Sequence, residues 1–249
     1  MGHHWNWGIF FTPVPTGETT YLGWLLSGLR VTVTLSLLAW VLALVIGSFM
    51  GTLRTVPNRW LVRTATAYVE GFRNVPLLVQ LFIAYFVLPE ITPGGNRFKE
   101  LNPGAQQFLA STSCLALFTG ARVCEQMRSG IQSLPPGLKN AGLSLGLTLP
   151  QTYRHLLVPM ALRIVVPPLT SEFLNIFKNS AVCSTIGLLE LAAQGRQLLD
   201  YTGQAYESFI AVTALYAAIN LVTLFAMNQV EKRSRLPGTI GVPTPQPDP

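Results

Sequence analysis

The stretch VTVTLSLLAWVLALVIGSFMGTL, from Val31 to Leu53, contains no charged residue, and arginines flank it at positions 30 and 54. A helix needs about 20 predominantly apolar residues to cross the hydrocarbon core of a bilayer. This stretch meets that requirement over its whole length. It therefore predicts a transmembrane helix, and it makes the chain an integral membrane protein.

The composition of the whole chain agrees with a membrane protein. Of its 249 residues, 49% are hydrophobic and only 11% are charged, whereas a soluble domain carries about 25% charged residues. The net charge of +6 does not indicate nucleic-acid binding, because the basic residues are spread between apolar segments instead of gathering on one polar face. Three cysteines in apolar stretches lack the spacing of metal ligands, which predicts free, buried thiols at Cys114, Cys124 and Cys183.

Four further apolar segments complete a predicted all-α fold of about five transmembrane helices. They cover approximately residues 64–89, 107–127, 164–189 and 209–230. The last of them has no charged residue, but the other three carry acids and bases at depths where charge is costly. These charged residues are Glu70 and Arg73, Arg122 and Glu125, and Glu172 and Lys178.

Loop charge predicts how the helices are oriented. The connections between the first and second helices and between the third and fourth contain basic residues and no acid, whereas the other two connections are balanced or net acidic. Lysine and arginine collect in cytoplasmic loops, so the N-terminus is expected outside and the C-terminus inside. The predicted organisation is an external segment over residues 1–27, a transmembrane domain over 28–235 and a disordered, proline-rich cytoplasmic tail over 236–249.

The basic connection over residues 131–159 has the sequence of a folded pair of short helices. Two prolines suit a first helical turn, a glycine suits a left-handed C-cap, a Thr/Gln pair forms a capping box, and a final proline is expected to end the second helix. In order, these residues are Pro135 and Pro136, Gly146, Thr148 with Gln151, and Pro159. Six leucines either pack on the ends of the spanning helices or face a partner protein. They are Leu138, Leu143, Leu145, Leu149, Leu156 and Leu157.

The spacing within this connection resembles the EAA loop of ABC importer permeases. That loop has the pattern Glu-Ala-Ala, three residues, Gly, nine residues, Ile-x-Leu-Pro, and it is the coupling helix that docks in a groove of the ATP-binding subunit. The corresponding residues here are Asn140, Ala141, Gly142, Gly146, Leu156 and Pro159. Asn140 replaces the usual glutamate and Gly142 the second alanine, so any ionic contact of that glutamate with the ATPase is absent here or made by another residue.

Four other segments resemble the polar amino acid branch of these permeases, and the resemblance extends from about Gly28 to Arg235. They are residues 70–89, 121–137, 149–182 and 186–191. The resemblance implies a type I ABC importer permease fold in a multi-pass protein of the cell inner membrane. It also implies a second permease subunit, either a homologue or a copy of this chain, two ATP-binding subunits, and an external binding protein that delivers the amino acid substrate.

Hydrolysis of ATP is expected in a partner subunit and not in this chain. The sequence contains no Walker A pattern GxxxxGK[ST], which is the usual loop that holds the phosphates of ATP. ATP and Mg²⁺ are therefore assigned to the partner ATPase, and no cofactor is expected in this chain. A nucleophile elbow and an HExxH motif are also lacking, which argues against a membrane enzyme.

Five intramembrane charges are the predicted residues of the substrate path: Arg122, Glu70, Arg73, Glu172 and Lys178. At a rise of about 1.5 Å per residue, the first four fall in one layer about 8 to 14 Å from the cytoplasmic ends of their helices, with Lys178 nearer the outside. One interpretation is a structural layer of ion pairs, in which Glu70 pairs with Arg73 on one helix and Arg122 pairs with Glu125 on another. The other is that Arg122 holds a substrate carboxylate through paired hydrogen bonds.

Arg122 also bears on the class of substrate. The permeases that this chain resembles often have tyrosine at this position, and an additional arginine most simply serves a second substrate carboxylate. Residues 121–123 and 150–153 are also more similar to acidic amino acid permeases than to those for histidine or arginine. Glutamate and aspartate are therefore the predicted substrates. The alternatives are another polar amino acid such as glutamine, with Arg122 in an ion pair only, and a secondary transporter, against which the lack of a detectable internal repeat argues.

Overall fold

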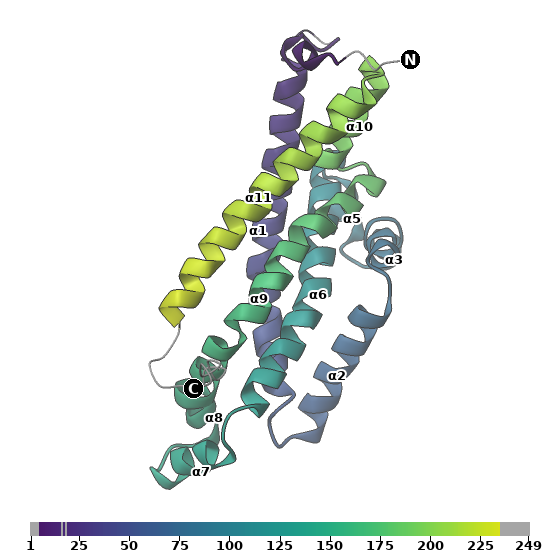
Figure 1. The fold of residues 1–249 in the computed structure, drawn as a ribbon. Helices are drawn as coiled ribbons and strands as arrows, with labels where there is room; N and C mark the ends of the chain where they lie inside the picture. The colour runs from purple at the N-terminus through teal and green to yellow at the C-terminus, as the bar shows by residue number, and fades with distance from the viewer. Residues whose placement is uncertain (1–4, 16, 18, 235–249) are drawn as a thin grey trace, which may run out of the picture.

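The computed structural model describes residues 5–15, 17 and 19–234, and its regular structure is helical (Figure 1). Among these residues the only β interaction is an isolated antiparallel bridge between Pro13 and Thr20. The predicted all-α fold is therefore confirmed. The predicted tail over residues 236–249 lies outside the described residues.

Helix α1 (Tyr21–Leu53) contains the uncharged apolar stretch and starts before it. Its N-cap is Thr20, whose hydroxyl oxygen accepts a hydrogen bond of 3.3 Å from a backbone N–H of the first turn. α1 packs along α6 (Pro103–Gln132), the central helix of the bundle, which also contacts α2 (Arg59–Asn74) and α9 (Val158–Ser180). The four helices build the core that positions the functional residues.

Small residues let α1 and α6 approach closely. Buried alanines and glycines recur every four residues along one face of α1, at Ala39, Ala43, Gly47 and Gly51. A Cβ atom added at Gly47 would lie 2.5 Å from the Gly120 carbonyl oxygen, and one added at Gly51 would lie 2.6 Å from the carbonyl oxygen of Cys124. Such spacing is typical of close helix–helix contacts in membranes. The thiol of Cys124 is free and buried, as predicted for all three cysteines.

The prediction of one continuous helix over the second span is wrong, because the chain bends at Pro76. After α2 the chain continues as α3 (Leu77–Phe82), η2 (Ile83–Val87) and α4 (Leu88–Ile91), and this stretch is bent by 105° from α2. Proline lacks an N–H and restricts the preceding residue to extended backbone, and Val75 has φ −100° and ψ 132°. Figure 1 shows α3 beside the bundle instead of along it.

Pro159 does not end the second helix of the loop, which corrects the prediction from the sequence. α8 (Leu149–Thr152) continues through η3 (Tyr153–Leu157) into α9. η3 is a π-helical turn, in which the Val158 N–H donates to the carbonyl oxygen of Tyr153. The wider turn relieves the clash between a proline ring and the carbonyls of the preceding turn, which would otherwise stop the helix.

The acidic connection between the fourth and fifth predicted spans contains a helix that the sequence did not predict. α9 passes into η4 (Ala181–Ile186), and α10 (Leu191–Thr202) follows before α11 (Ala205–Ser234) begins. Two of the acids counted as loop charges, Glu190 and Glu207, are completely buried. They therefore contribute to packing at this end of the bundle and not to an exposed acidic loop.

Buried Glu190 ties three helices together. Its carboxylate accepts hydrogen bonds from two backbone N–H groups at the start of α10, at 2.8 and 3.0 Å, and from the Tyr216 hydroxyl of α11 at 2.7 Å. The Thr32 hydroxyl of α1 donates to it from 3.4 Å. A buried carboxylate is tolerated when its oxygens are hydrogen-bonded. Glu190 is thus a structural anchor.

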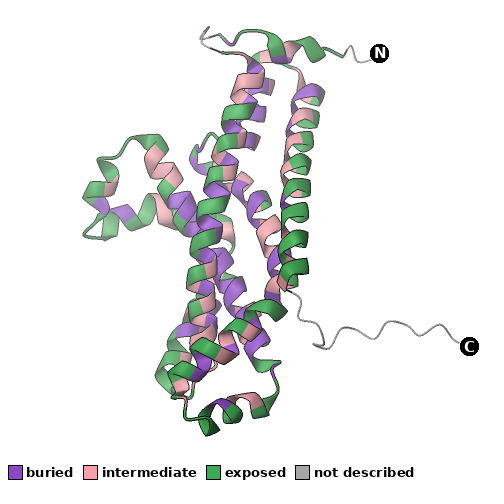
Figure 2. Cartoon of the chain, turned by 90° about the vertical axis from the view of Figure 1, so that its left-hand side faces the viewer, coloured by how far each residue is buried: buried purple, intermediate pink, exposed green. Residues whose placement is uncertain are grey.

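In the part of the chain that the structure describes, three helical segments are long and apolar enough to cross a membrane: α1, residues 149–186 and α11. The bent pair of α2 with residues 77–91 would make a fourth. α6 is more polar, but half of its 30 residues are buried between the other helices and so need not suit lipid. Figure 2 shows buried residues along the inner sides of the long helices and exposed residues along their outer sides.

The two ends of the bundle carry different elements. η1 (Trp7–Phe11), α10 and the start of α11 lie at one end (Figure 1). The connection from α1 to α2, the short helix α7 (Pro136–Ser144) and α8 lie at the other end. α5 (Gly95–Lys99) lies with α3 and α4 at the side.

Candidate functional site

A polar pocket of about 200 Å³ is formed by residues of α2, α6 and α9. Its lining residues are Arg73, Arg122, Glu125, Gln126 and Glu172. Three of the five residues predicted for the substrate path therefore meet in it. The other two, Glu70 on α2 and Lys178 in the last turn of α9, are exposed and do not line it.

Glu125 is surrounded by three guanidinium groups. Its Oε1 contacts Arg54 Nη1 and lies 3.4 Å from Arg73 Nη1, and its Oε2 accepts from Arg128 Nη1 at 3.4 Å. The predicted pair of Arg73 with Glu70 is therefore wrong. Helical spacing identifies neighbours within α2, but the packing of α2 against α6 turns Arg73 toward a carboxylate on the other helix.

Arg122 faces Glu172 of α9, and not Glu125 as the structural interpretation predicted. Its Nη1 lies 3.8 Å from Glu172 Oε2, which is too long for a hydrogen bond, and that buried oxygen has no hydrogen-bond partner among the described residues. The guanidinium carbon lies 5.0 Å from the centroid of the Phe118 ring, and 43% of the Arg122 side chain is exposed. Its N–H groups can therefore donate to a carboxylate in the pocket.

The ion pairs at the pocket leave an excess of positive charge. Four arginines lie within 4.0 Å of the Glu125 and Glu172 carboxylates, so this cluster has four positive and two negative charges, a net charge of +2. Arg54 and Arg128 contact Glu125 from outside the pocket, whose own lining of two arginines and two glutamates is balanced. Uncompensated charge at membrane depth is costly, and it marks substrate paths more often than lipid-facing surfaces. The surplus of arginine around Glu125, together with the loosely paired Arg122, therefore suits a ligand that carries a carboxylate.

Glu125 and Gln126 line the pocket although the predicted path included neither. Both lie on the same face of α6 as Arg122, since residues three and four positions apart are neighbours on a helix. This spacing was the signal that could have placed them. The polar face of α6 therefore includes Glu125 and Gln126 as well as Arg122.

The predicted helix caps in the connection over residues 131–159 are confirmed. α7 ends in a Schellman motif, in which Gly146 has a φ of +84° and its N–H donates to the Leu143 carbonyl oxygen at 3.0 Å. A second hydrogen bond between backbone groups, of 3.2 Å, completes the motif. Both halves of the capping box of Thr148 and Gln151 then start α8. The loop is thus a folded element with a fixed turn at Gly146.

The loop leucines divide between the two interpretations. Leu157 is buried, and Leu138 and Leu149 pack against the core at the ends of the long helices. Leu143 and Leu145 remain 41% and 81% exposed. The exposed pair forms an apolar surface of the kind that marks interaction sites.

Gly142 has a packing reason to replace the alanine of the EAA pattern. It is buried against α8, and a Cβ atom there would lie 2.7 Å from Thr152 Cγ2. An alanine would therefore clash unless Thr152 moved. Of the other residues that match the pattern, Leu156 is partly buried and the rest are exposed, namely Asn140, Ala141, Gly146 and Pro159.

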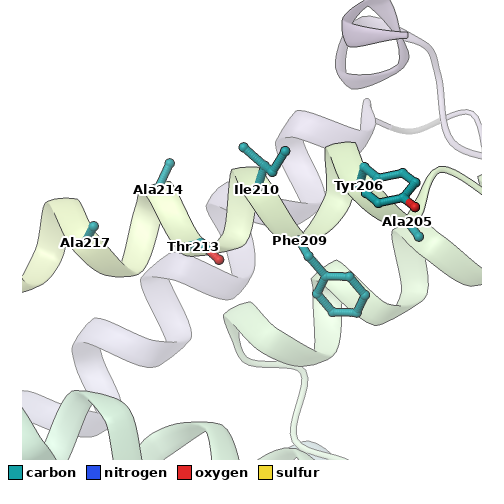
Figure 3. A pocket seen from close by; sticks show the side chains of 7 residues that line it. All are labelled: Ala205, Tyr206, Phe209, Ile210, Thr213, Ala214 and Ala217. Atoms are coloured by element: carbon teal, nitrogen blue, oxygen red, sulfur yellow. The ribbon is translucent and has the colours of Figure 1, made fainter. Parts of the chain in front are cut away.

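A larger hollow of about 510 Å³ lies on the outer face of α11 and differs in chemistry (Figure 3). Its lining comes from this one helix, at Ala205, Tyr206, Phe209, Ile210, Thr213, Ala214 and Ala217. None of these residues is charged. The surface suits acyl chains or another apolar helix and offers no charged partner for the carboxylate or ammonium group of an amino acid.

Comparisons with known proteins agree with this architecture. The family model described as binding-protein-dependent transport system inner membrane component matches residues 43–236. The chain is 57% identical over 244 residues to the glutamate/aspartate import permease protein GltJ of Escherichia coli (strain K12), over 97% of this chain and 99% of that protein. It is 31% identical over 212 residues to the glutamine transport system permease protein GlnP of the same strain, over 85% of this chain and 93% of that protein.

A solved structure supports the same relationship. The crystal structure of an amino acid ABC transporter with histidines superimposes on this chain with a TM-score of 0.72 at 31% identity, covering 86% of this chain and 95% of the other. The predicted resemblance to ABC importer permeases is therefore confirmed in both sequence and fold. The chain belongs to the family of binding-protein-dependent transport system inner membrane components.

Proposed function

We propose that this chain is the permease subunit of an ATP-driven importer and forms the translocation path for glutamate and aspartate delivered by an external binding protein. The observation that carries the proposal is the half-exposed guanidinium of Arg122 in this pocket, which lies 3.8 Å from Glu172 and so keeps N–H groups available for a substrate carboxylate. The identity of 57% to a glutamate/aspartate import permease, over 97% of the chain, supports the same substrates.

In this proposal Arg122 holds a substrate carboxylate, and Arg73 supplies a second cation at the pocket. A guanidinium binds a carboxylate through two parallel hydrogen bonds, which fixes orientation as well as charge. Glu172 offers the opposite charge that the ammonium group of an amino acid requires. Glu70 and Lys178 belong to the proposed path outside the pocket, on the exposed faces of α2 and α9.

The proposed assembly places this chain in the cell inner membrane with a second permease subunit, either a homologue or a copy of itself, and two ATP-binding subunits that hold ATP and Mg²⁺. About five spans are proposed, namely α1, the bent pair of α2 with residues 77–91, α6, residues 149–186 and α11. The basic loops support an external N-terminus and a cytoplasmic C-terminus. The coupling loop, over residues 131–159, then faces the ATP-binding subunits.

Gly146→Val tests the coupling role of this loop. Valine at a φ of +84° is strained by about 1 to 2 kcal/mol, because its Cβ approaches the following carbonyl. The strain should shift the exposed Leu145 and reduce substrate-stimulated ATP hydrolysis several-fold in complexes that still assemble. Hydrolysis by purified complexes, with and without the loaded binding protein, measures this effect.

The matched control for the loop is Gly137→Val in the first turn of α7, where no atom lies within 4 Å of an added Cβ. This variant should couple normally. Full stimulation in an assembled Gly146→Val complex would show that the loop does not couple hydrolysis to transport.

Uptake by purified complexes in liposomes tests the assignment of substrate. With ATP inside, and with glutamate and glutamine each supplied with a binding protein that delivers it, glutamate and aspartate are expected to accumulate faster than glutamine. Faster uptake of glutamine would favour the alternative in which Arg122 serves only as the partner of Glu172. Uptake that persists without the ATP-binding subunits would indicate a secondary transporter.

A further inference from the structure

A basic pocket lies at the coupling-loop end of the bundle, apart from the pocket around Arg122. It has a volume of about 400 Å³ and is lined by Val56, Pro57, Asn58, Arg59, Val62 and Arg63. Among the described residues, no carboxylate lies within 4.0 Å of Arg59 or Arg63. Two uncompensated cations one helical turn apart can therefore act together on one anion.

Trp60 lies beside these arginines and is 75% exposed. The guanidinium carbon of Arg63 lies 5.6 Å from the centroid of its ring. Exposed indole rings of membrane proteins concentrate at the membrane–water interface, and arginine side chains reach the headgroup region from there. Val56 and Val62 add apolar surface to the same pocket. Cationic, aromatic and apolar groups thus occur together at one site.

The turn that forms the pocket is held in place on both sides. The Tyr153 hydroxyl of η3 donates to the Thr55 carbonyl oxygen at 2.7 Å. The Asn58 side-chain oxygen accepts from the N–H groups of Trp60 and Leu61 in the first turn of α2, at 3.0 and 3.3 Å. Val56 packs against the hydrophobic core. The two arginines are therefore presented by a fixed turn, so little conformational entropy is lost when an anion binds.

The position along the bundle fits the surface of a membrane. Figure 1 shows α7 extending beyond the start of α2, the helix whose first turns contain both arginines. In the proposed orientation, a ligand at this position would lie at the boundary between the spanning helices and water. The groups that such a ligand needs are a phosphate for the arginines and a hydrocarbon chain for the valines.

We propose that this pocket binds an anionic phospholipid, with Arg59 and Arg63 on the headgroup phosphate and Trp60 at the membrane interface. Juxtamembrane basic groups are attracted to the anionic lipids of the cytoplasmic leaflet. The choice of leaflet rests on the proposed orientation, but the binding itself depends on neither the substrate nor the proposed role of residues 131–159 in coupling ATP hydrolysis to transport. The site can therefore be tested separately from transport.

Native mass spectrometry of the purified complex, titrated with phosphatidylglycerol or phosphatidylcholine, tests the site. The double variant Arg59→Gln with Arg63→Gln should weaken the tightest phosphatidylglycerol binding roughly thirty-fold, from the loss of two interfacial cations. Phosphatidylcholine binding should not change. The control, Arg97→Gln with Arg196→Gln, removes two exposed arginines elsewhere and should bind like the unmodified complex.

Unchanged phosphatidylglycerol binding in the double variant would overturn the proposal. Loss of the ATP-binding subunits from the double variant, with lipid binding unchanged, would also overturn the proposal, because the pocket would then be a contact surface for those subunits. Displacement of the bound lipid by inorganic phosphate alone would also contradict it, since the valines would then contribute nothing.

A measurement that needs no arginine variant covers the case in which the double variant fails to fold. The fluorescence of Trp60, isolated as the difference from a Trp60→Phe complex, should be quenched more by brominated phosphatidylglycerol than by equal amounts of brominated phosphatidylcholine. Equal quenching by the two lipids would rule out a preference for anionic headgroups at this site.

Discussion

Gly47→Leu is expected to prevent the chain from accumulating as a folded subunit. A Cβ atom at this position would lie 2.5 Å from the Gly120 carbonyl oxygen and 2.6 Å from Val123 Cβ, and the remaining leucine atoms would need still more room between α1 and α6. Neither a backbone carbonyl nor a Cβ can turn away as a flexible side chain can. The cost should exceed about 3 kcal/mol, at the upper end for overpacking. Membrane levels and thermal unfolding of the purified subunit measure it.

The matched control for Gly47→Leu is Gly71→Leu on α2, where no atom lies within 4 Å of an added Cβ. It makes the same chemical change on an exposed helix face and should be tolerated. Normal accumulation of Gly47→Leu would show that α1 and α6 are not held at the close distance described.

Arg122→Tyr is expected to weaken transport of glutamate and aspartate by about tenfold to 150-fold, since a charge-assisted contact contributes about 1.5 to 3 kcal/mol. The complex should still assemble and retain basal ATP hydrolysis, because 43% of the Arg122 side chain is exposed and its contact with Glu172 is long, at 3.8 Å. Arg122→Lys should recover only part of the loss, because an ammonium group lacks the planar fork of a guanidinium. Arg163→Tyr, at an exposed arginine outside the pocket, should have little effect.

A second variant separates binding of substrate from neutralisation of Glu172. If Arg122 only compensates that buried carboxylate, Arg122→Tyr combined with Glu172→Gln should restore transport that the single change removes. If Arg122 holds the substrate, the double variant should transport no better than Arg122→Tyr. Initial rates of uptake over a range of glutamate concentrations distinguish the two results.

The fold of residues 131–159 could be predicted in detail because its sequence signals are local. A left-handed glycine and a capping box depend on residues within one or two turns, and both Gly146 and the pair Thr148 and Gln151 behave as their sequence indicated. The prediction that Pro159 ends the helix was wrong because the preceding π-helical turn accommodates the proline. No single residue in the sequence indicates such a turn.

The ion pairs of Arg73 and Arg122 could not be predicted because they join different helices. Spacing of three or four residues identifies neighbours on one helix, but Arg73 of α2 contacts Glu125 of α6. The same limit applies to Glu190, whose Tyr216 and Thr32 partners come from two other helices. Packing between helices decides these contacts, and it depends on side chains far apart in the sequence.

Two features of the fold were visible in the sequence but needed the structure to interpret them. The spacing of Gly47 and Gly51 is a known signal of close helix packing, and it lies within the apolar stretch that indicated a membrane protein. Pro76 marks the bend after α2, but a proline inside an apolar run is also compatible with a kinked span. Hydrophobicity alone does not distinguish these outcomes.

The measurement that tests the central claim most directly is uptake of glutamate and of glutamine by Arg122→Tyr complexes in liposomes, each relative to the rate of the unmodified complex. Both substrates are supplied with a binding protein that delivers them. A path in which Arg122 binds the second carboxylate of the substrate predicts that glutamate uptake falls at least about tenfold while glutamine uptake and basal ATP hydrolysis are retained. An equal loss for both substrates, or no loss of either, would contradict this role of Arg122.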